Sequence, residues 1–232
     1  MRLDKFMCES TELSRVDAKK ALHRGDVTCN GEVVKKPGTK VTDVCEVRLE
    51  GKLLKVRGPR FIMLNKPANM LCSNVDEEYP SVLRMLNIEK IDALHIAGRL
   101  DADTTGLVLI TDDGQWSHKI TSPKKECGKR YRVQLADPVD NTLVATFAKG
   151  LQLRNEKGLT KPAVLEIISA TEVLLTIVEG KYHQVKRMFA VVGNKVIGLH
   201  REQVGSITLD KNLKPGEWRY LTEEEIAHAN QT

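Results

Sequence analysis

A polar stretch at the end of the first quarter of the chain limits how the sequence can fold. Residues 50–59 hold two glycines, a proline and several charges, which is typical of a connection between folded parts. The chain has 232 residues, of which 29% are charged and 41% hydrophobic, so it has the composition of one or two globular domains. We therefore predict a small domain over residues 1–58 and a larger one over residues 59–232.

The two predicted domains differ in charge. Residues 1–58 hold 13 Lys and Arg against 9 Asp and Glu, a net charge of +4. The other 174 residues hold 23 against 22, a net charge of +1. The excess of positive charge therefore lies mainly in the small domain. A phosphate backbone is a natural partner for such a domain, although four extra charges alone would also fit a solvated surface.

The small domain is predicted to begin with two helices. The i, i+3, i+4 spacing of a buried helix face is present at Leu3, Phe6 and Met7. Ser14 stands three residues before Asp17, which is typical of a helix start, and Gly25 is typical of a left-handed helix end. After this second helix, residues 27–29 and 32–34 predict two strands joined by an Asn-Gly turn.

The second predicted helix carries a basic stripe opposite its small apolar face. The pattern Arg2-Leu3-Asp4, Ser14-Arg15 with Ala18, and residues 25–31 resembles the S4 RNA-binding domain over about 50 residues. The resemblance implies that the helix docks on RNA, and the side chains that it assigns to this contact are Arg15, Lys19, Lys20 and Arg24.

Several classes of protein are disfavoured by what the sequence lacks. The five cysteines are widely spaced with no Cys-x-x-Cys pair, and the metalloprotease, P-loop and dinucleotide-binding patterns are absent. We therefore expect no metal and no nucleotide cofactor. No stretch approaches the roughly 20 apolar residues of a membrane helix, and the first five residues include three charges, unlike a secretory signal. We expect a cytoplasmic protein that does not bind membranes.

The larger domain mixes strands and helices without strict alternation, which predicts an α+β fold. Strands are predicted at residues 60–64, 107–111 and 131–135, and a hairpin at 163–168 and 172–178. Helical spacing is present at residues 143–149 and 181–192.

One segment of the larger domain stands out chemically. Residues 98–107 place an arginine, two carboxylates and two threonines between glycines, immediately before an apolar strand. Such a loop exposes its side chains while the strand holds it in place. For Asp103 and the two threonines we favour a purely local role, in which they satisfy backbone amides in a turn.

Four stretches of the larger domain together resemble the pseudouridine synthases. The catalytic motif is matched by Gly98-Arg99-Leu100-Asp101 with Thr104 and Gly106-Leu107. Three further stretches match motifs of the family and follow its order along the chain: Asn65-Lys66-Pro67, Lys129-Arg130-Tyr131 and residues 179–188. With the S4-like part, the combination is most similar to the bacterial branch that modifies 16S ribosomal RNA. The resemblance implies a mixed, mainly antiparallel sheet with flanking helices.

The resemblance also implies roles for individual residues. Asp101 would be the nucleophile, Lys186 would keep it ionised, and Tyr131 would lie against a flipped-out uracil. Arg99 would grip the RNA or fill the gap in the stack, with a salt bridge to Asp103 as its alternative, and Lys66 would contact RNA. The expected substrate is uridine 516 of 16S RNA, presented as naked RNA or in a small-subunit assembly intermediate, to an enzyme that acts as a monomer.

Two positions depart from the family pattern. Asn69 stands where relatives usually carry glycine, but asparagine tolerates the left-handed conformation, so we expect the same loop shape. Lys186 stands where many relatives outside this branch have arginine, which keeps the charge but loses the planar fork.

Two other functions are considered. Asp101-x-Asp103-x-Thr105 also matches the signature of haloacid-dehalogenase-type phosphatases, but there the apolar strand precedes the first Asp, whereas here it follows. A pure RNA-binding or assembly protein with an inactive synthase domain is the second possibility. The presence of Asp101, Tyr131 and Lys186 argues against it.

Overall fold

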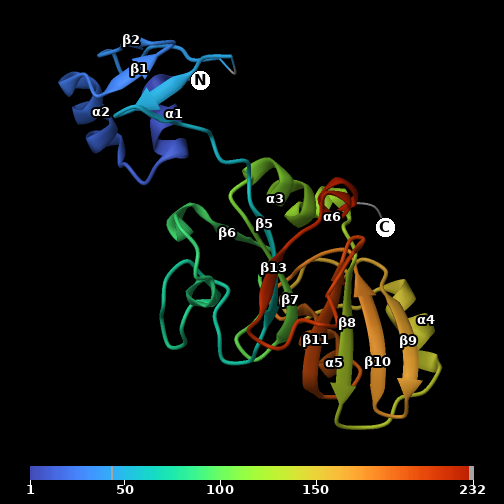
Figure 1. Cartoon of the computed structure of the whole chain (residues 1–232). Helices are drawn as coiled ribbons and strands as arrows, with labels where there is room; N and C mark the ends of the chain where they lie inside the picture. The colour runs from blue at the N-terminus through green and yellow to red at the C-terminus, as the bar shows by residue number, and fades with distance from the viewer. Residues whose placement is uncertain (43, 230–232) are drawn as a thin grey trace. The chain divides into compact units, whose positions relative to one another are not determined.

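The computed structural model describes residues 1–42 and 44–229, which form two compact units (Figure 1). The first unit comprises residues 1–59 and the second begins at Arg60. The division falls at the end of the polar stretch of residues 50–59, one residue after the predicted boundary.

The first unit begins with the two predicted helices, α1 (Leu3–Ser10) and α2 (Arg15–Arg24). The Ser14 side chain accepts a hydrogen bond from the Asp17 backbone N–H, and Gly25 ends the helix with φ of 89°. Both predicted helix ends are therefore confirmed. The inward face of α2 is closely packed because Ala18, Ala21 and Leu22 are buried.

Four short strands complete this unit, in the order β2-β1-β3-β4. They are β1 (Val27–Cys29), β2 (Glu32–Val33), β3 (Val47–Leu49) and β4 (Lys52–Leu53). Asn30 and Gly31 both have positive φ and form the predicted turn between β1 and β2. One expectation is corrected: Glu50-Gly51 is a hairpin turn between β3 and β4, so the connection between the units begins only after β4.

The second unit is built on a nine-stranded sheet with the order β13-β5-β7-β11-β8-β10-β9; β6 also pairs with β7, and β12 with β11. The strands are β5 (Phe61–Lys66), β6 (His95–Ala97), β7 (Thr105–Thr111), β8 (Lys129–Leu135), β9 (Val164–Ser169), β10 (Glu172–Ile177), β11 (Val196–Val204), β12 (Ile207–Thr208) and β13 (Trp218–Tyr220). Among the described residues β7 and β11 pair in parallel and the other pairings are antiparallel. The α+β fold with a mainly antiparallel sheet is confirmed.

Helices cover both faces of this sheet. They are α3 (Gly114–Thr121), α4 (Thr142–Lys149), α5 (Gln184–Val191) and α6 (Glu223–His228), with single-turn 3₁₀ helices at Val82–Met85, Ile91–Ala93 and Pro123–Lys125. Phe147 of α4 and Phe189 of α5 belong to the core on one face, and Trp116 of α3 to the core on the other. No helix in the part of the chain that the structure describes is long and apolar enough to cross a membrane.

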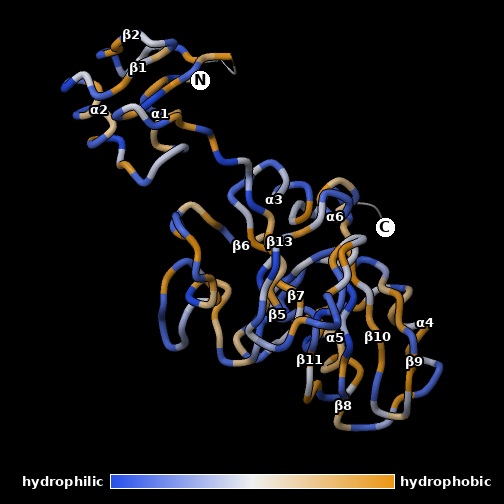
Figure 2. Tube along the Cα trace, in the orientation of Figure 1, coloured by the Kyte–Doolittle hydropathy of each residue, from blue (hydrophilic) through white to orange (hydrophobic). Residues whose placement is uncertain are grey.

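Residues 61–64 of β5 and 107–110 of β7 are all hydrophobic, because both faces of these strands are buried. Along β5, Ile62 and Leu64 pack in one core while Phe61 and Met63 pack in the other. Towards the far edge of the sheet, β8 and β10 alternate buried and partly exposed residues. The mixture of hydrophobic and hydrophilic residues along the tube can be followed in Figure 2.

The sequence did not predict β6, β13, α3 or α6, and the sequence-based expectation differs from the structure at β11 and at the start of α5. Strand β11 was not predicted, because Gly198, His200 and Arg201 interrupt its apolar pattern, yet it lies in the middle of the sheet. Helix α5 begins at Gln184 rather than Lys181, because His183 adopts a left-handed conformation with φ of 47°.

The backbones of β7 and β11 come very close where β7 begins. Gly106 has φ of 104° and pairs with Arg201. A Cβ atom at Gly106 would lie 2.3 Å from the carbonyl oxygen of Arg201, a distance that no side chain tolerates. Only glycine therefore allows the two strands to meet at this position.

We expect Gly106→Ala to lower the free energy of unfolding by about 3 kcal/mol or more, because it adds a backbone clash to an unfavourable φ. Gly114→Ala is the matched control, since no atom lies within 4 Å of the added carbon and its φ is not positive. Urea unfolding of both variants measures the difference. Equal stability of the two would contradict the assigned role of Gly106.

Candidate active site

A cleft of about 980 Å³ opens in the second unit and brings together side chains from distant parts of the sequence. Asp101, Tyr131, Lys186 and Arg99 all line it. The three residues predicted to be catalytic therefore lie in one cavity, although they come from a loop, a strand and a helix.

Asp101 lies on the loop that leads from β6 into β7. Its carbonyl oxygen accepts a hydrogen bond of 3.1 Å from the Thr104 N–H, which closes a tight turn. The Asp101 side chain is 30% exposed, while that of Asp103 is 69% exposed. Asp101 is therefore the more enclosed of the two carboxylates, and its side chain borders the cavity.

Lys66 of β5 forms hydrogen bonds with this loop, and these contacts correct one of our predictions. Its ammonium group donates hydrogen bonds to the carbonyl oxygens of Pro67, Ala102 and Thr104 at 3.0, 2.9 and 2.7 Å. The side chain is fully buried, and this burial lowers its pKa. Because all three donors are used inside the protein, Lys66 does not fit the RNA-contacting role that the sequence suggested.

Arg201 of β11 also forms hydrogen bonds with this loop. Its guanidinium donates to the carbonyl oxygens of Leu107 and Gly98, both at 2.8 Å. The side chain is 1% exposed. Sequence analysis missed Arg201 because a single arginine in an unpredicted strand gives no signal before its neighbours are known.

Asn69 adds a third attachment. Its backbone N–H donates to the Ala102 carbonyl oxygen at 2.8 Å, and its φ of 61° lies in the left-handed region. The expectation that asparagine adopts the conformation usually given to glycine is confirmed.

Lys186 of α5 lies between the two carboxylates of the loop. Its Nζ is 3.3 Å from Asp101 Oδ2, and it donates to both Asp103 oxygens at 2.7 and 2.9 Å. The hydrogen bond from Lys186 lowers the pKa of Asp103. Burial acts to lower the pKa of Lys186, but the two carboxylates outweigh it and raise that pKa. Lys186 is therefore a fixed positive charge shared by Asp101 and Asp103.

Asp103 thus has a partner that the sequence did not suggest. The alternative salt bridge between Arg99 and Asp103 is wrong, because Lys186 takes both Asp103 oxygens. Arg99 is exposed and lines the cleft, where it can meet a substrate.

Tyr131 belongs to β8, directly opposite Arg201 in the register of β8 and β11. The side chain is mostly buried in the core but also borders the cleft. It can therefore offer an aromatic surface to a bound ring while its position is held by the sheet.

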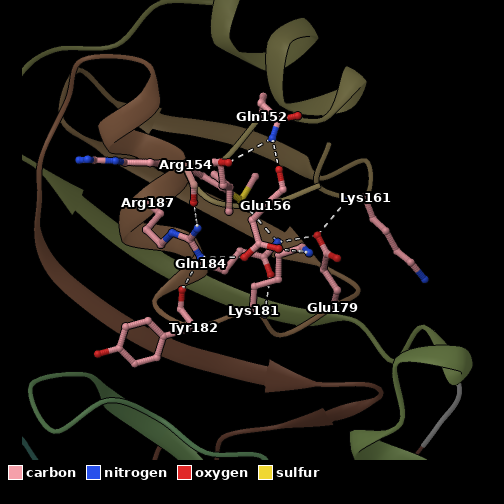
Figure 3. Close-up of polar contacts among 11 residues, drawn as sticks. Gln152, Arg154, Glu156, Lys161, Glu179, Lys181, Tyr182, Gln184 and Arg187 are labelled. Atoms are coloured by element: carbon pink, nitrogen blue, oxygen red, sulfur yellow. Dashed lines mark hydrogen bonds and ion pairs between the residues drawn. The ribbon is translucent and has the colours of Figure 1, made fainter. Parts of the chain in front are cut away.

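A polar network fixes the segment that carries Lys186 (Figure 3). Glu156 pairs with Lys181 at 2.9 Å and with Arg187 at 3.1 Å, and hydrogen bonds from these two side chains lower the pKa of Glu156. Gln184 donates to Glu179 at 2.8 Å and accepts from the Lys181 backbone N–H. The loop after α4 therefore anchors residues 179–187 at the edge of the cleft.

The predicted RNA-contacting side chains of α2 are all exposed, but they differ in their surroundings. Lys20 lies 3.6 Å from Asp17, and Arg24 pairs with Asp26 at 2.7 Å. Arg15 and Lys19 have no salt bridge among the described residues. These two are therefore the cations most available to a phosphate.

Comparisons with known proteins agree with this architecture. Residues 60–191 match the RNA pseudouridylate synthase family and residues 1–46 match the S4 domain. A ribosomal small subunit pseudouridine synthase A from Vibrio vulnificus is 57% identical over 228 residues, which is 97% of this chain and 98% of the relative. A protein of the same name from Escherichia coli K12 is 55% identical, over 98% and 99% of the two chains.

A solved structure also matches along the whole length. The crystal structure of a pseudouridylate synthase has 50% sequence identity and a TM-score of 0.72, and covers 99% of each chain. The chain belongs to the RNA pseudouridylate synthase family and carries an S4 domain at its N-terminal end. It is therefore an isomerase, and the phosphatase alternative is wrong.

The position of Lys186 between Asp101 and Asp103 leads to a prediction about its charge. We expect Lys186→Met to lower the single-turnover rate at saturating RNA by about 10²-fold, because it removes the positive charge beside Asp101. Lys186→Arg keeps that charge and should retain most of the rate. If Lys186→Met instead changes only the RNA concentration needed for half-maximal rate, Lys186 binds RNA and does not serve Asp101.

Proposed function

We propose that this protein converts uridine 516 of 16S ribosomal RNA to pseudouridine. The observation that supports this most directly is the placement of Asp101, which lies in the cleft on an anchored loop with Lys186 at 3.3 Å. The choice of substrate rests on relatives that are named for the ribosomal small subunit and are 57% and 55% identical over nearly the whole chain.

The reaction breaks the bond between N1 of uracil and C1′ of ribose, turns the ring, and joins C1′ to C5. The proton on C5 is lost and N1 gains one, so there is no net oxidation. In our proposal the Asp101 carboxylate is the nucleophile, attacking either the ring or C1′. Both routes need the ionised carboxylate, and Lys186 supplies the compensating charge.

In our proposal the target uridine leaves its helix before reaction. Reaching Asp101 requires a uridine to be unstacked, at a cost of a few kcal/mol. We assign Tyr131 to contact with the flipped uracil and Arg99 to the RNA at the rim. The exposed cations of α2 dock on phosphates elsewhere in the RNA.

The proposed substrate is 16S RNA, free or in a small-subunit assembly intermediate, and the enzyme acts on it as a monomer in the cytoplasm. Pseudouridine mapping of ribosomal RNA from cells that lack the protein tests this proposal. A map missing one 16S site would support it, while an unchanged map would overturn it and favour the pure RNA-binding alternative.

The assignment of the nucleophile predicts a sharp contrast within one loop. Asp101→Asn should lower pseudouridine formation by about 10⁴-fold or more, because it keeps the shape and removes the nucleophilic charge. Asp103→Asn removes the same charge two residues away and should retain activity within about tenfold, since Lys186 still faces Asp101. Measurable turnover by Asp101→Asn protein free of wild type would disprove the assignment.

The docking role of α2 predicts a change in salt dependence. Replacing Arg15 and Lys19 together by Gln should weaken RNA binding and reduce the slope of log affinity against log salt by up to about 2, because two phosphate contacts are lost. The double change Lys35→Gln and Lys36→Gln is the control, since it removes equal charge from exposed residues outside α2. Filter binding at several salt concentrations measures both, and identical slopes for the two proteins would contradict the prediction.

A further inference from the structure

An exposed aromatic side chain stands at the mouth of the cleft without a role in the proposed reaction. Tyr182 is 77% exposed, a large fraction for a tyrosine. Figure 3 shows its ring extending away from the polar network that anchors its backbone. Both Tyr182 and the adjacent His183 line the cleft.

The two rings form a stack. The centroids of Tyr182 and His183 are 3.8 Å apart, and the ring planes differ by 21°. One face of Tyr182 therefore rests on His183. The large exposure of Tyr182 leaves its ring accessible to another planar group.

The stack is tied to the nucleophile at its inner end. Nε2 of His183 lies 3.5 Å from Oδ1 of Asp101. The backbone of His183 adopts the left-handed conformation, which is unfavourable for a residue with a side chain. A base stacked on the outer face of Tyr182 would lie beside this stack and not on the Asp101 carboxylate, which fits a neighbouring nucleotide better than the target uracil.

The backbone under Tyr182 is also fixed. Its carbonyl oxygen accepts a hydrogen bond of 3.1 Å from Arg187, and the same guanidinium donates to Glu156 and to the Arg154 carbonyl oxygen. A ring held in this way loses little freedom when it binds. Stacking on an aromatic side chain is sequence-tolerant because every base has a flat face.

We propose that the Tyr182–His183 stack is a platform for an unstacked base next to the target uridine. The inference rests on the proposed function, and it adds a second base-binding position to the site. The platform holds the flanking nucleotide outside the helix while the target uridine occupies the cavity at Asp101.

Equilibrium binding of transcribed 16S RNA tests the platform. Tyr182→Ala should weaken binding by roughly 5- to 100-fold, as expected for the loss of one stacked base, and Tyr182→Phe should bind within about twofold of wild type. Tyr220→Ala is the control, because Tyr220 is also an exposed tyrosine but does not line the cleft. Circular dichroism checks that each variant is folded.

Each outcome of this experiment has one meaning. Equal binding by Tyr182→Ala and Tyr220→Ala would overturn the platform, and equal losses in the Ala and Phe variants would show that the hydroxyl group binds RNA instead. Binding does not require turnover, so this result holds whether or not the RNA is modified. Pseudouridine formation by wild type in parallel samples reports separately on the proposed function.

A second measurement identifies the base. Two short RNAs are used, both containing the target uridine. One carries an abasic residue on the 5′ side of that uridine and the other on its 3′ side. The loss caused by Tyr182→Ala should disappear with one of these RNAs, because the stacking partner is already missing. A loss that persists with both RNAs would show that Tyr182 does not stack on a flanking base.

Discussion

The loop that carries Asp101 depends on two buried positive charges that are bound to backbone carbonyl groups. Lys66 and Arg201 approach residues 98–107 from different strands, and together they donate to carbonyl oxygens on both sides of Asp101. Burying a charge without partners costs several kcal/mol, so Lys66 and Arg201 each need the hydrogen bonds that they donate to these carbonyl oxygens. The carbonyl oxygens offset the cost, and the loop gains one conformation.

The same arrangement explains which residues the sequence could reveal. The helices of the small unit were predictable because their ends use local signals, such as Ser14 and Gly25. Strands β5 and β7 were predictable because both of their faces are buried. Asp101, Tyr131 and Lys186 were identified by resemblance, and the structure brings them to one cleft. Their chemical roles stay predictions.

The residues that the sequence did not reveal act over long distances. Arg201 lies in a strand whose pattern is broken by glycine, histidine and arginine, and those residues become meaningful only beside β7 and β8. Lys66 was expected to contact RNA from the family resemblance, whereas its ammonium group donates to two carbonyl oxygens of the loop and to that of Pro67. The attachment of Lys186 to Asp103 also could not be read from the sequence, since 83 residues separate the two.

The parallel pairing of β7 with β11 has a consequence for the order of folding. His200 lies opposite Thr105, and the two are 95 residues apart, whereas Val27 and Leu49 of the small unit pair across 22 residues. Closing the longer loop costs more entropy and is slower. The small unit can therefore fold early, while the loop that carries Asp101 lacks its contacts with Arg201 until β11 pairs with β7. A nascent or partly unfolded chain would hold RNA before it could modify any uridine.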